Sequence, residues 1–228
     1  MKKKHFKNTM VLLFVLGVLA GCTKSKPDIT IANLKLSLIS ENTTHTKYLA
    51  FSEKAVQDGY LQISKLFKAL ATAEGVHAKN FRNILVSTGE KFEDTDPTSP
   101  VESTEKNLQN AIKEEIMDID SIYPLYIKQS ENSLIKQANQ TFSYTWEAEK
   151  THKNLLVMIY DVLMTKVEVN KKGLVSAPSG EKLPKIEELF SSTEYYVCPV
   201  DGRVYDNSNV PDKCRLCLTP KENFIIIK

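Results

Sequence analysis

Two short motifs in this sequence would place a carboxylate and an imidazole on the same face of a helix. They are Glu74-x-x-His77 and Glu149-x-x-His152, and residues three apart in the chain are neighbours on a helical surface. Carboxylate oxygens combined with imidazole nitrogens suit iron or manganese better than a structural zinc ion. The two motifs therefore predict a metal site to which two helices each contribute a pair of ligands.

Helical periodicity dominates the chain from about residue 30 to residue 165, in four stretches separated by short polar breaks. Near the middle of each stretch, the apolar face contains an acidic residue. In the first and third stretches these residues are Glu41 and Glu115, and Asp118 follows Glu115 by about one helical turn. One such carboxylate could reach solvent at the edge of its helix. Several buried together would cost more free energy than the roughly 5–15 kcal/mol by which a domain is stable, unless cations lay between them.

This arrangement predicts a mainly α protein built on a ferritin-like four-helix bundle at residues 30–165. In such bundles two helices supply one Glu each and the other two supply Glu-x-x-His, so that carboxylates bridge two metal ions. The buried seam of the third helix is predicted to run through Leu108, Ile112, Glu115, Ile119, Ile122 and Tyr126.

Three cysteines gather near the end of the chain, in Cys198-Pro-Val-Asp201-Gly202 and Cys214-Arg-Leu-Cys217. Three thiols are an odd number, which favours a metal site over a set of disulfides, and a β module of residues 195–228 is too small to fold on its apolar core alone. Asp201 stands where a fourth thiolate would complete the ligand set. Two readings stay open. Either its carboxylate is the fourth ligand, or it caps the turn before Gly202 and leaves three thiolates and a water.

The first 21 residues have the pattern of a bacterial export signal, with a Lys-rich start, an apolar run and small residues before Cys22. The apolar run is too short for a comfortable membrane-spanning helix. Leu19-Ala20-Gly21-Cys22 resembles the lipobox, in which the cysteine is lipidated and becomes the mature N-terminus. We expect an exported lipoprotein anchored at the cell envelope, with a tether at residues 22–29. The alternative is an uncleaved anchor or a plain secretory signal.

Residues 166–194 lose periodicity, gather Gly and Pro, and are predicted to be a linker. The whole chain has 30 basic and 28 acidic residues, a net charge of +2, and no segment that concentrates Lys and Arg strongly. We therefore expect no nucleic-acid partner.

Taken in order, these segments resemble the rubrerythrin family over about residues 31–225. The matching segments are Glu41-Asn-Thr-Thr-His-Thr-Lys-Tyr48, Ala73-Glu74-Gly-Val-His77, Glu115-Ile-Met-Asp118 ahead of Tyr123-Pro124, Glu147-Ala-Glu149-Lys-Thr-His152, Tyr196-Val-Cys198-Pro-Val-Asp201-Gly202 and Pro211-Asp-Lys-Cys214-Arg-Leu-Cys217. The resemblance implies a ferritin-like bundle that holds two iron ions, followed by a rubredoxin-like β domain that holds one iron, or a zinc, ion.

The resemblance also implies a role for each residue. In the bundle, iron would be bound by Glu41, Glu74, Glu115 and Glu149, with Glu74 and Glu149 as bridges and His152 as a terminal ligand, and one iron would move between positions held by His77 and Asp118. The mononuclear metal would be held by Cys198, Asp201, Cys214 and Cys217. Tyr48 and Tyr123 would hydrogen-bond the ligands or the peroxide. Both tyrosines would also fit as ordinary core residues. Three residues depart from the family, since Asp118 replaces a Glu, Asp201 a Cys and Leu218 a Gly.

A member of this family would be a non-haem di-iron peroxidase that reduces hydrogen peroxide to water, with electrons relayed through the mononuclear site, here protecting the cell envelope from oxidative stress. The resemblance also implies a homodimer in which one subunit's rubredoxin-like domain lies near the other's di-iron site. The usual electron supply is cytoplasmic, so an exported member would need an unidentified donor. The alternative is an iron-binding or ferroxidase-type protein without efficient peroxide turnover, which Asp118 and Asp201 favour.

Overall fold

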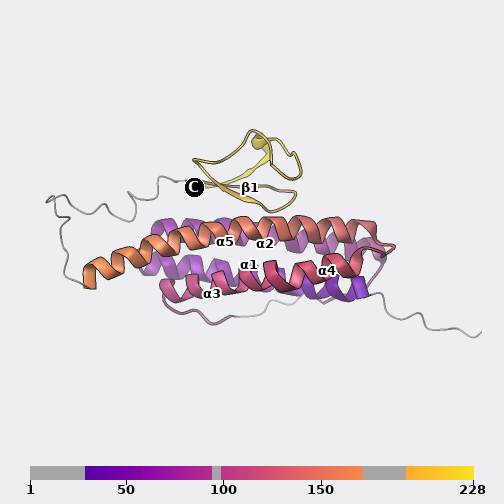
Figure 1. Ribbon diagram of the computed structural model, residues 1–228, viewed down its shortest axis with the longest axis horizontal. Helices are drawn as coiled ribbons and strands as arrows, with labels where there is room; N and C mark the ends of the chain where they lie inside the picture. Colours follow the sequence, from indigo (N-terminus) through magenta and orange to yellow (C-terminus); the bar gives the residue numbers. More distant parts are fainter. Residues whose placement is uncertain (1–28, 94–98, 172–193) are drawn as a thin grey trace, which may run out of the picture.

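The computed structural model describes residues 29–93, 99–171 and 194–228, and it shows a bundle of four helical rods with a small sheet on one side (Figure 1). The helices are α1 (Ile29–Gln57), α2 (Leu61–Thr88), α3 (Thr104–Met117), the π-helical turn η1 (Asp118–Ile122), α4 (Tyr123–Ser130) and α5 (Lys136–Lys171). The third rod is a composite of α3, η1 and α4. The predicted mainly α fold with a small C-terminal β domain is confirmed, and α5 continues to Lys171, past residue 165.

The apolar core of the bundle has two parts, with a layer of polar side chains between them. The change is easy to follow along α2, where the buried seam runs Leu70, Glu74, His77, Phe81. Leu70 belongs to one apolar cluster and Phe81 to the other. The polar layer is therefore shielded from solvent along the bundle axis in both directions.

Pro124 explains why the third rod contains a π-helical turn. A proline has no N–H, and its ring crowds the carbonyl four residues earlier, here that of Asp120, so the α-helical pattern cannot pass through it. Instead the N–H of Tyr123 reaches back five residues to the carbonyl of Asp118. The extra residue in this turn changes which side chains of the third rod face the core. Both isoleucines of η1, expected on the buried seam, are only half-buried, and Tyr123 takes the inward place.

The chain ends in a three-stranded antiparallel sheet in the order β2-β1-β3. Its strands are β1 (Tyr195–Val197), β2 (Val204–Asp206) and β3 (Ile225–Ile227), with a 3-10 turn η2 (Lys221–Asn223) before β3. Tyr196 of β1 pairs with Tyr205 on one side and with Ile226 on the other. The strands are short, so most of this domain consists of turns.

The sheet packs on the face of the bundle formed by α2 and α5 (Figure 1). Tyr195, Val197, Val204 and Ile227 belong to the same buried apolar cluster as residues of the bundle. The C-terminal domain therefore shares part of the bundle's core.

Polar contacts surround this apolar interface. Asn80 of α2 donates its side-chain N–H to the carbonyl of Val200 at 2.8 Å, and Arg203 donates to Glu147 of α5 at 3.1 Å. These contacts fix which corner of the C-terminal domain faces the bundle.

Residues 1–28, which contain the predicted export signal and Cys22, lie outside the described residues, and so does most of the predicted linker. Within the ranges that the structure describes, no helix is both long and apolar enough to cross a bilayer.

Gly202 lies at the corner of the C-terminal domain that meets the bundle. Its φ of +76° is in the left-handed region, and a Cβ added to it would lie 2.2 Å from Nε2 of His77. There is no room for that atom, since non-bonded carbon and nitrogen atoms do not approach so closely. The packing of the C-terminal domain against the bundle therefore depends on the absence of a side chain at Gly202.

We expect Gly202→Ala to lift this corner off the bundle. Gly59→Ala is the matched control, because Gly59 has a similar φ of +84° but nothing within 4 Å of its added Cβ. Both variants carry a backbone cost of about 1–2 kcal/mol, and only Gly202→Ala adds a clash. Amide hydrogen exchange of β2 should rise about tenfold in Gly202→Ala alone. Equal exchange of β2 in the two variants would contradict this account of the interface.

Candidate metal centres

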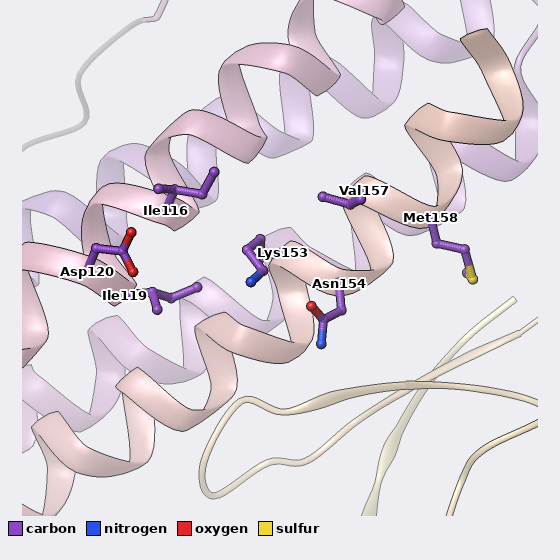
Figure 2. A pocket seen from close by; sticks show the side chains of 7 residues that line it. All are labelled: Ile116, Ile119, Asp120, Lys153, Asn154, Val157 and Met158. Carbon is purple, nitrogen blue, oxygen red and sulfur yellow. The ribbon is translucent and has the colours of Figure 1, made fainter. Parts of the chain in front are cut away.

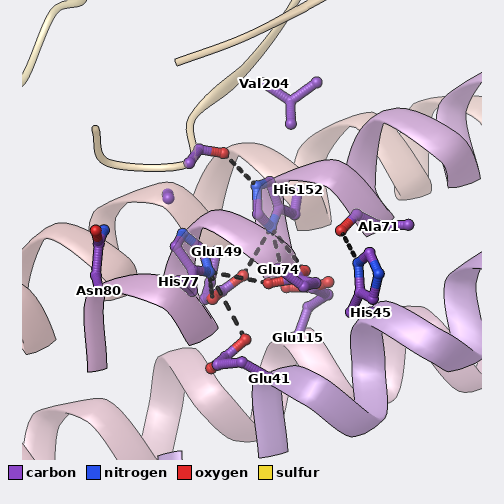
Figure 3. A network of polar contacts seen from close by, with 12 residues as sticks. Glu41, His45, Ala71, Glu74, His77, Asn80, Glu115, Glu149, His152 and Val204 are labelled. Carbon is purple, nitrogen blue, oxygen red and sulfur yellow. Dashed lines mark hydrogen bonds and ion pairs between the residues drawn. The ribbon is translucent and has the colours of Figure 1, made fainter. Parts of the chain in front are cut away.

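Six buried side chains from all four rods meet at the centre of the bundle (Figure 3). They are Glu41 of α1, Glu74 and His77 of α2, Glu115 of α3, and Glu149 and His152 of α5. Each exposes 4% of its surface or less. The structure therefore brings together all of the predicted bundle ligands except Asp118.

Their ligand atoms form two groups of four, and within each group these atoms all lie within 4.8 Å of one another. One group is Glu41, Glu74, His77 and Glu149, and the other is Glu74, Glu115, Glu149 and His152. Glu74 and Glu149 belong to both groups. Two carboxylates shared in this way can bridge two neighbouring cations.

The two imidazoles point their Nδ1 atoms into this cluster. Nδ1 of His77 lies 2.9 Å from Glu74 and 3.1 Å from Glu149, and Nδ1 of His152 lies 2.7 Å from Glu149 and 3.3 Å from Glu74. The rings stack with centroids 5.6 Å apart. The three-residue spacing of each Glu-x-x-His motif thus produces the predicted common face.

The opposite ring nitrogens point out of the cluster, toward the C-terminal domain. Nε2 of His77 lies 3.0 Å from the carbonyl oxygen of Asp201, and Nε2 of His152 lies 3.0 Å from that of Gly202. A carbonyl oxygen can only accept, so each Nε2 carries a hydrogen. In a neutral imidazole the lone pair is then on Nδ1, where it can bind a metal ion.

Burial opposes ionisation throughout the cluster. It raises the pKa of Glu41 and of Glu115 well above the usual value, and neighbouring carboxylates add to the effect. Burial acts on Glu74 and Glu149 too, but the nearby imidazoles hold the pKa of each below its usual value. The same carboxylates raise the pKa of both imidazoles against the effect of burial. Without cations, this cluster approaches neutrality only by holding protons.

Metal ions fit this centre better than protons do. Within the described part of the chain, Oε2 of Glu115 is buried without a hydrogen-bond partner. Oε1 of Glu74 and Oε2 of Glu149 both approach the single Nδ1 of His152, at 3.3 and 2.7 Å, and none of these three buried atoms makes a well-formed hydrogen bond. The four carboxylates of the two groups carry four negative charges when ionised, which two divalent cations would neutralise. The bundle therefore provides two adjoining metal sites that share Glu74 and Glu149.

Two tyrosines hold the outer oxygens of the unshared carboxylates. The hydroxyl of Tyr48 donates to Glu115 at 2.7 Å, and the hydroxyl of Tyr123 donates to Glu41. Burial, followed by the charge of the carboxylate beside each, raises the pKa of both tyrosines well above the usual value. They stay protonated and donate, so one oxygen of each carboxylate is held while the other is free to bind metal.

Asp118 lies beside the two groups and belongs to neither. It is the first residue of η1, and burial followed by the charges of Glu149 and Glu74 raises its pKa to about 8. Its role as a movable ligand stays a prediction. The side chain of His45 is engaged elsewhere, since its Nδ1 lies 2.6 Å from the carbonyl oxygen of Ala71.

A third group of ligand atoms lies in the C-terminal domain. Cys198, Asp201, Cys214 and Cys217 bring three sulfurs and a carboxylate oxygen within 4.8 Å of one another, and the three thiols are free. The sulfurs of Cys198 and Cys217 are 3.4 Å apart. The structure thus assembles the predicted mononuclear site, and the C-terminal domain provides a third metal site.

Two turns of the same shape carry these ligands. The N–H of Gly202 bonds the carbonyl of Cys198 at 3.1 Å, and the N–H of Leu218 bonds the carbonyl of Cys214 at the same distance. The φ angles of Gly202 and Leu218 are +76° and +63°. Leu218 therefore adopts the left-handed backbone that suits glycine, at a cost of about 1–2 kcal/mol.

The two carboxylate oxygens of Asp201 have different partners. Oδ1 accepts the backbone N–H of Arg203 at 3.0 Å, and Oδ2 lies 2.8 Å from the sulfur of Cys214. The first contact caps the turn, and the second places an oxygen among the sulfurs. Burial opposes the ionised carboxylate, but the thiols of Cys214 and Cys217 hold the pKa of Asp201 below its usual value. The structure therefore shows the turn cap at Oδ1, and it leaves Oδ2 placed where it could be the fourth ligand; which of the two readings of the metal site holds stays a prediction.

Sequence reasoning missed the residues that hold the C-terminal domain against the bundle, which are Asn80, Glu147, Thr151 and Arg203. Asn80, Glu147 and Thr151 look like ordinary residues of a solvated helix face, and Arg203 looks like an ordinary loop residue. The one available signal is the four-residue spacing of Glu147 and Thr151, which puts both on one side of α5.

Comparisons with known proteins agree with this architecture. A family model described as Rubrerythrin matches residues 32–160. Rubrerythrin-2 of Clostridium acetobutylicum is 30% identical over 81% of this chain and 89% of the relative, and nigerythrin of Nitratidesulfovibrio vulgaris is 26% identical over 86% and 85%. A solved structure of fully reduced, all-ferrous nigerythrin has a TM-score of 0.71 at 23% identity, covering 99% of this chain and 100% of that one.

The family model spans more than half of the chain, and the residues it covers include the whole paired site of the bundle. This chain therefore belongs to the rubrerythrin family of di-iron peroxide reductases.

Proposed function

We propose that this protein reduces hydrogen peroxide to water at the paired sites of the bundle, with iron as the metal. The reaction is H2O2 + 2 e− + 2 H+ → 2 H2O. The observation that carries the proposal is the pair of adjoining sites that share Glu74 and Glu149. Two neighbouring ferrous ions, when bound, supply both electrons to one peroxide molecule, which avoids the release of a hydroxyl radical.

The chain's own residues bind the metals, hold the ligands and limit access of water. Tyr48 and Tyr123 keep Glu115 and Glu41 in one orientation, so that their free oxygens face the metal positions. Apolar clusters lie on both sides of the polar layer. A site of this kind keeps the reaction away from bulk water.

Ligand chemistry and one relative support iron. Each group in the bundle combines three carboxylates with one imidazole, a set that suits iron or manganese. Nigerythrin, whose fold this chain shares, has been solved in an all-ferrous state.

We infer further that electrons enter the bundle from the C-terminal cluster. The side chain of Asp201 belongs to that cluster, and the backbone carbonyl of the same residue accepts the Nε2–H of His77 at 3.0 Å. The carbonyl of Gly202 accepts in the same way from His152. The path from one centre to the other therefore crosses a single residue and one hydrogen bond.

The location and assembly of the protein are proposals that rest on the sequence. We propose that residues 1–21 direct export, that lipid on Cys22 anchors the protein at the cell envelope, and that a donor outside the cytoplasm reduces it. A homodimer is proposed from the family resemblance. The expected placement of one subunit's C-terminal domain near the other's paired sites differs from this structure, in which the domain lies on the bundle of its own chain. The mass of the mature N-terminal peptide tests the anchor, and light scattering in solution tests the dimer.

Peroxide is expected to oxidise the reduced, iron-loaded protein with one molecule consumed per pair of bundle sites, and faster than dioxygen does. Anaerobic stopped-flow spectroscopy measures both rates. Glu149→Gln alters a carboxylate shared by both sites and should lower the peroxide rate on the order of a hundredfold. Glu53→Gln changes an exposed carboxylate of α1 and should leave the rate unchanged. Faster oxidation by dioxygen, without peroxide turnover, would favour the ferroxidase-type alternative instead.

Asp201→Asn separates the two roles of this side chain. The amide oxygen can still accept the N–H of Arg203 and cap the turn, but the charge that favours metal binding is lost. We expect the affinity of the C-terminal site for zinc to fall about tenfold to a hundredfold in a chelator competition assay, and Asp201→Cys to restore tight binding. If Asp201→Asn binds zinc as tightly as the parent protein, Asp201 only caps the turn.

A further inference from the structure

The π-helical turn η1 leaves the backbone carbonyl of Ile119 without a helical partner. In an α-helix the carbonyl of Ile119 would accept the N–H of Tyr123, but that N–H donates to Asp118. In a π-helix it would accept from residue 124, which is a proline and has no N–H. The carbonyl of Ile119 therefore needs a donor from another part of the chain.

Trp146 of α5 supplies that donor. Its indole Nε1–H lies 2.8 Å from the carbonyl oxygen of Ile119. An indole nitrogen can only donate, and Trp146 is the single tryptophan of the chain. The bond ties η1 to the helix that carries Glu149 and His152.

Packing does not enclose the other side of the turn. A pocket of about 570 Å³ lies between η1 and α5, with Ile119 and Asp120 on one side and Asn154 and Met158 on the other (Figure 2). None of the residues of η1 is fully buried. The hydrogen bond from Trp146 is therefore one of the restraints that hold the turn against α5.

A run of charged contacts braces Trp146. The ammonium of Lys150 lies 3.1 Å from the centroid of the indole ring, a cation–π contact, and 2.6 Å from one oxygen of Glu147. The other oxygen of Glu147 accepts from Arg203 at 3.1 Å. Arg203 is part of the C-terminal domain, two residues after Asp201. The C-terminal domain is thus connected with Trp146 through a charged run that consists of Arg203, Glu147 and Lys150.

We propose that Trp146 is a positioning residue for Asp118, which it holds by fixing η1, and that the charged run links the seating of the C-terminal domain to this turn. Asp118 is the first residue of η1, so a shift of the turn changes its distance from the paired sites. The position of η1 is then most restrained when the C-terminal domain, the proposed source of electrons, is docked on the bundle. The role of Asp118 in peroxide reduction rests on the proposed function, and the hold of Trp146 on η1 does not.

The first test uses Trp146→Phe in the full-length, metal-loaded protein. This change keeps an aromatic ring beside Lys150 and removes the indole N–H. Amide hydrogen exchange of a peptide that covers residues 118–127 should become about tenfold faster, because η1 loses its anchor on α5. Unchanged exchange in this peptide would overturn the positioning role.

Pro124→Ala provides a rescue that packing alone would not explain. It removes the block that proline places in the helix, so the carbonyl of Ile119 can accept a helical N–H, from Tyr123 in an α-helix or from residue 124 in a π-helical turn. In this background Trp146→Phe should speed the same exchange no more than about twofold. An equal effect of Trp146→Phe in both backgrounds would show that the ring, and not its N–H, holds the turn.

The second test breaks the charged run. Arg203→Met keeps an unbranched side chain and removes the ion pair with Glu147, so exchange at residues 118–123 should rise about threefold, together with exchange at residues 198–206. Lys35→Met is the matched control, because it removes the 2.9 Å ion pair between Lys35 of α1 and Glu90, two residues after the end of α2, and should leave η1 unchanged. A rise confined to residues 198–206 in Arg203→Met would overturn the link.

These outcomes are separable from the proposed function. If the exchange effects are as expected but the parent protein does not turn over peroxide, the hold on η1 stands and the proposed function is wrong. If peroxide turnover is present and exchange at η1 does not respond to Trp146→Phe, the proposed function stands and the positioning role is wrong.

Discussion

Four carboxylates buried at the centre of a bundle cannot all be ionised unless cations lie between them. The rest of the structure follows from this constraint. The rods place one carboxylate each in the same layer, apolar clusters close the layer on both sides, and the two tyrosines hold the unshared carboxylates so that their free oxygens face inward. An apolar layer in the same place would stabilise the fold more simply. The layer is best explained by the metals that it can bind.

The two histidines connect this polar layer to the C-terminal domain. Each Nδ1 faces the carboxylates, and each Nε2–H bonds a backbone carbonyl of the C-terminal domain. The same hydrogen bonds therefore set which ring nitrogen can bind metal and where the C-terminal domain sits. Gly202 makes the approach possible because it has no side chain. Metal binding in the bundle and docking of the domain are thus parts of one arrangement, which suits the proposed transfer of electrons between the two centres.

Much of the paired site could be predicted because its signals are local. Glu-x-x-His at helical spacing, repeated on two helices, marks a common face wherever the helices lie. The course of the third rod was harder to predict, since Pro124 converts one turn to π-helix and shifts the seam. The two contacts of Asp201 depend on where Arg203 and Cys214 lie in space. The contact of Trp146 with Ile119 joins residues on different rods and has no sequence pattern at all.

The most direct test is the metal content of the bundle together with its effect on stability. Protein purified anaerobically, with iron supplied during expression, should carry two metal ions in the bundle and one in the C-terminal domain. Removing the bundle metals should lower the free energy of unfolding at neutral pH by about 4 kcal/mol or more, as expected for ligands present at about a thousand times their dissociation constants. A bundle that is isolated without metal, does not bind added iron or manganese, and is equally stable in their presence would contradict the account.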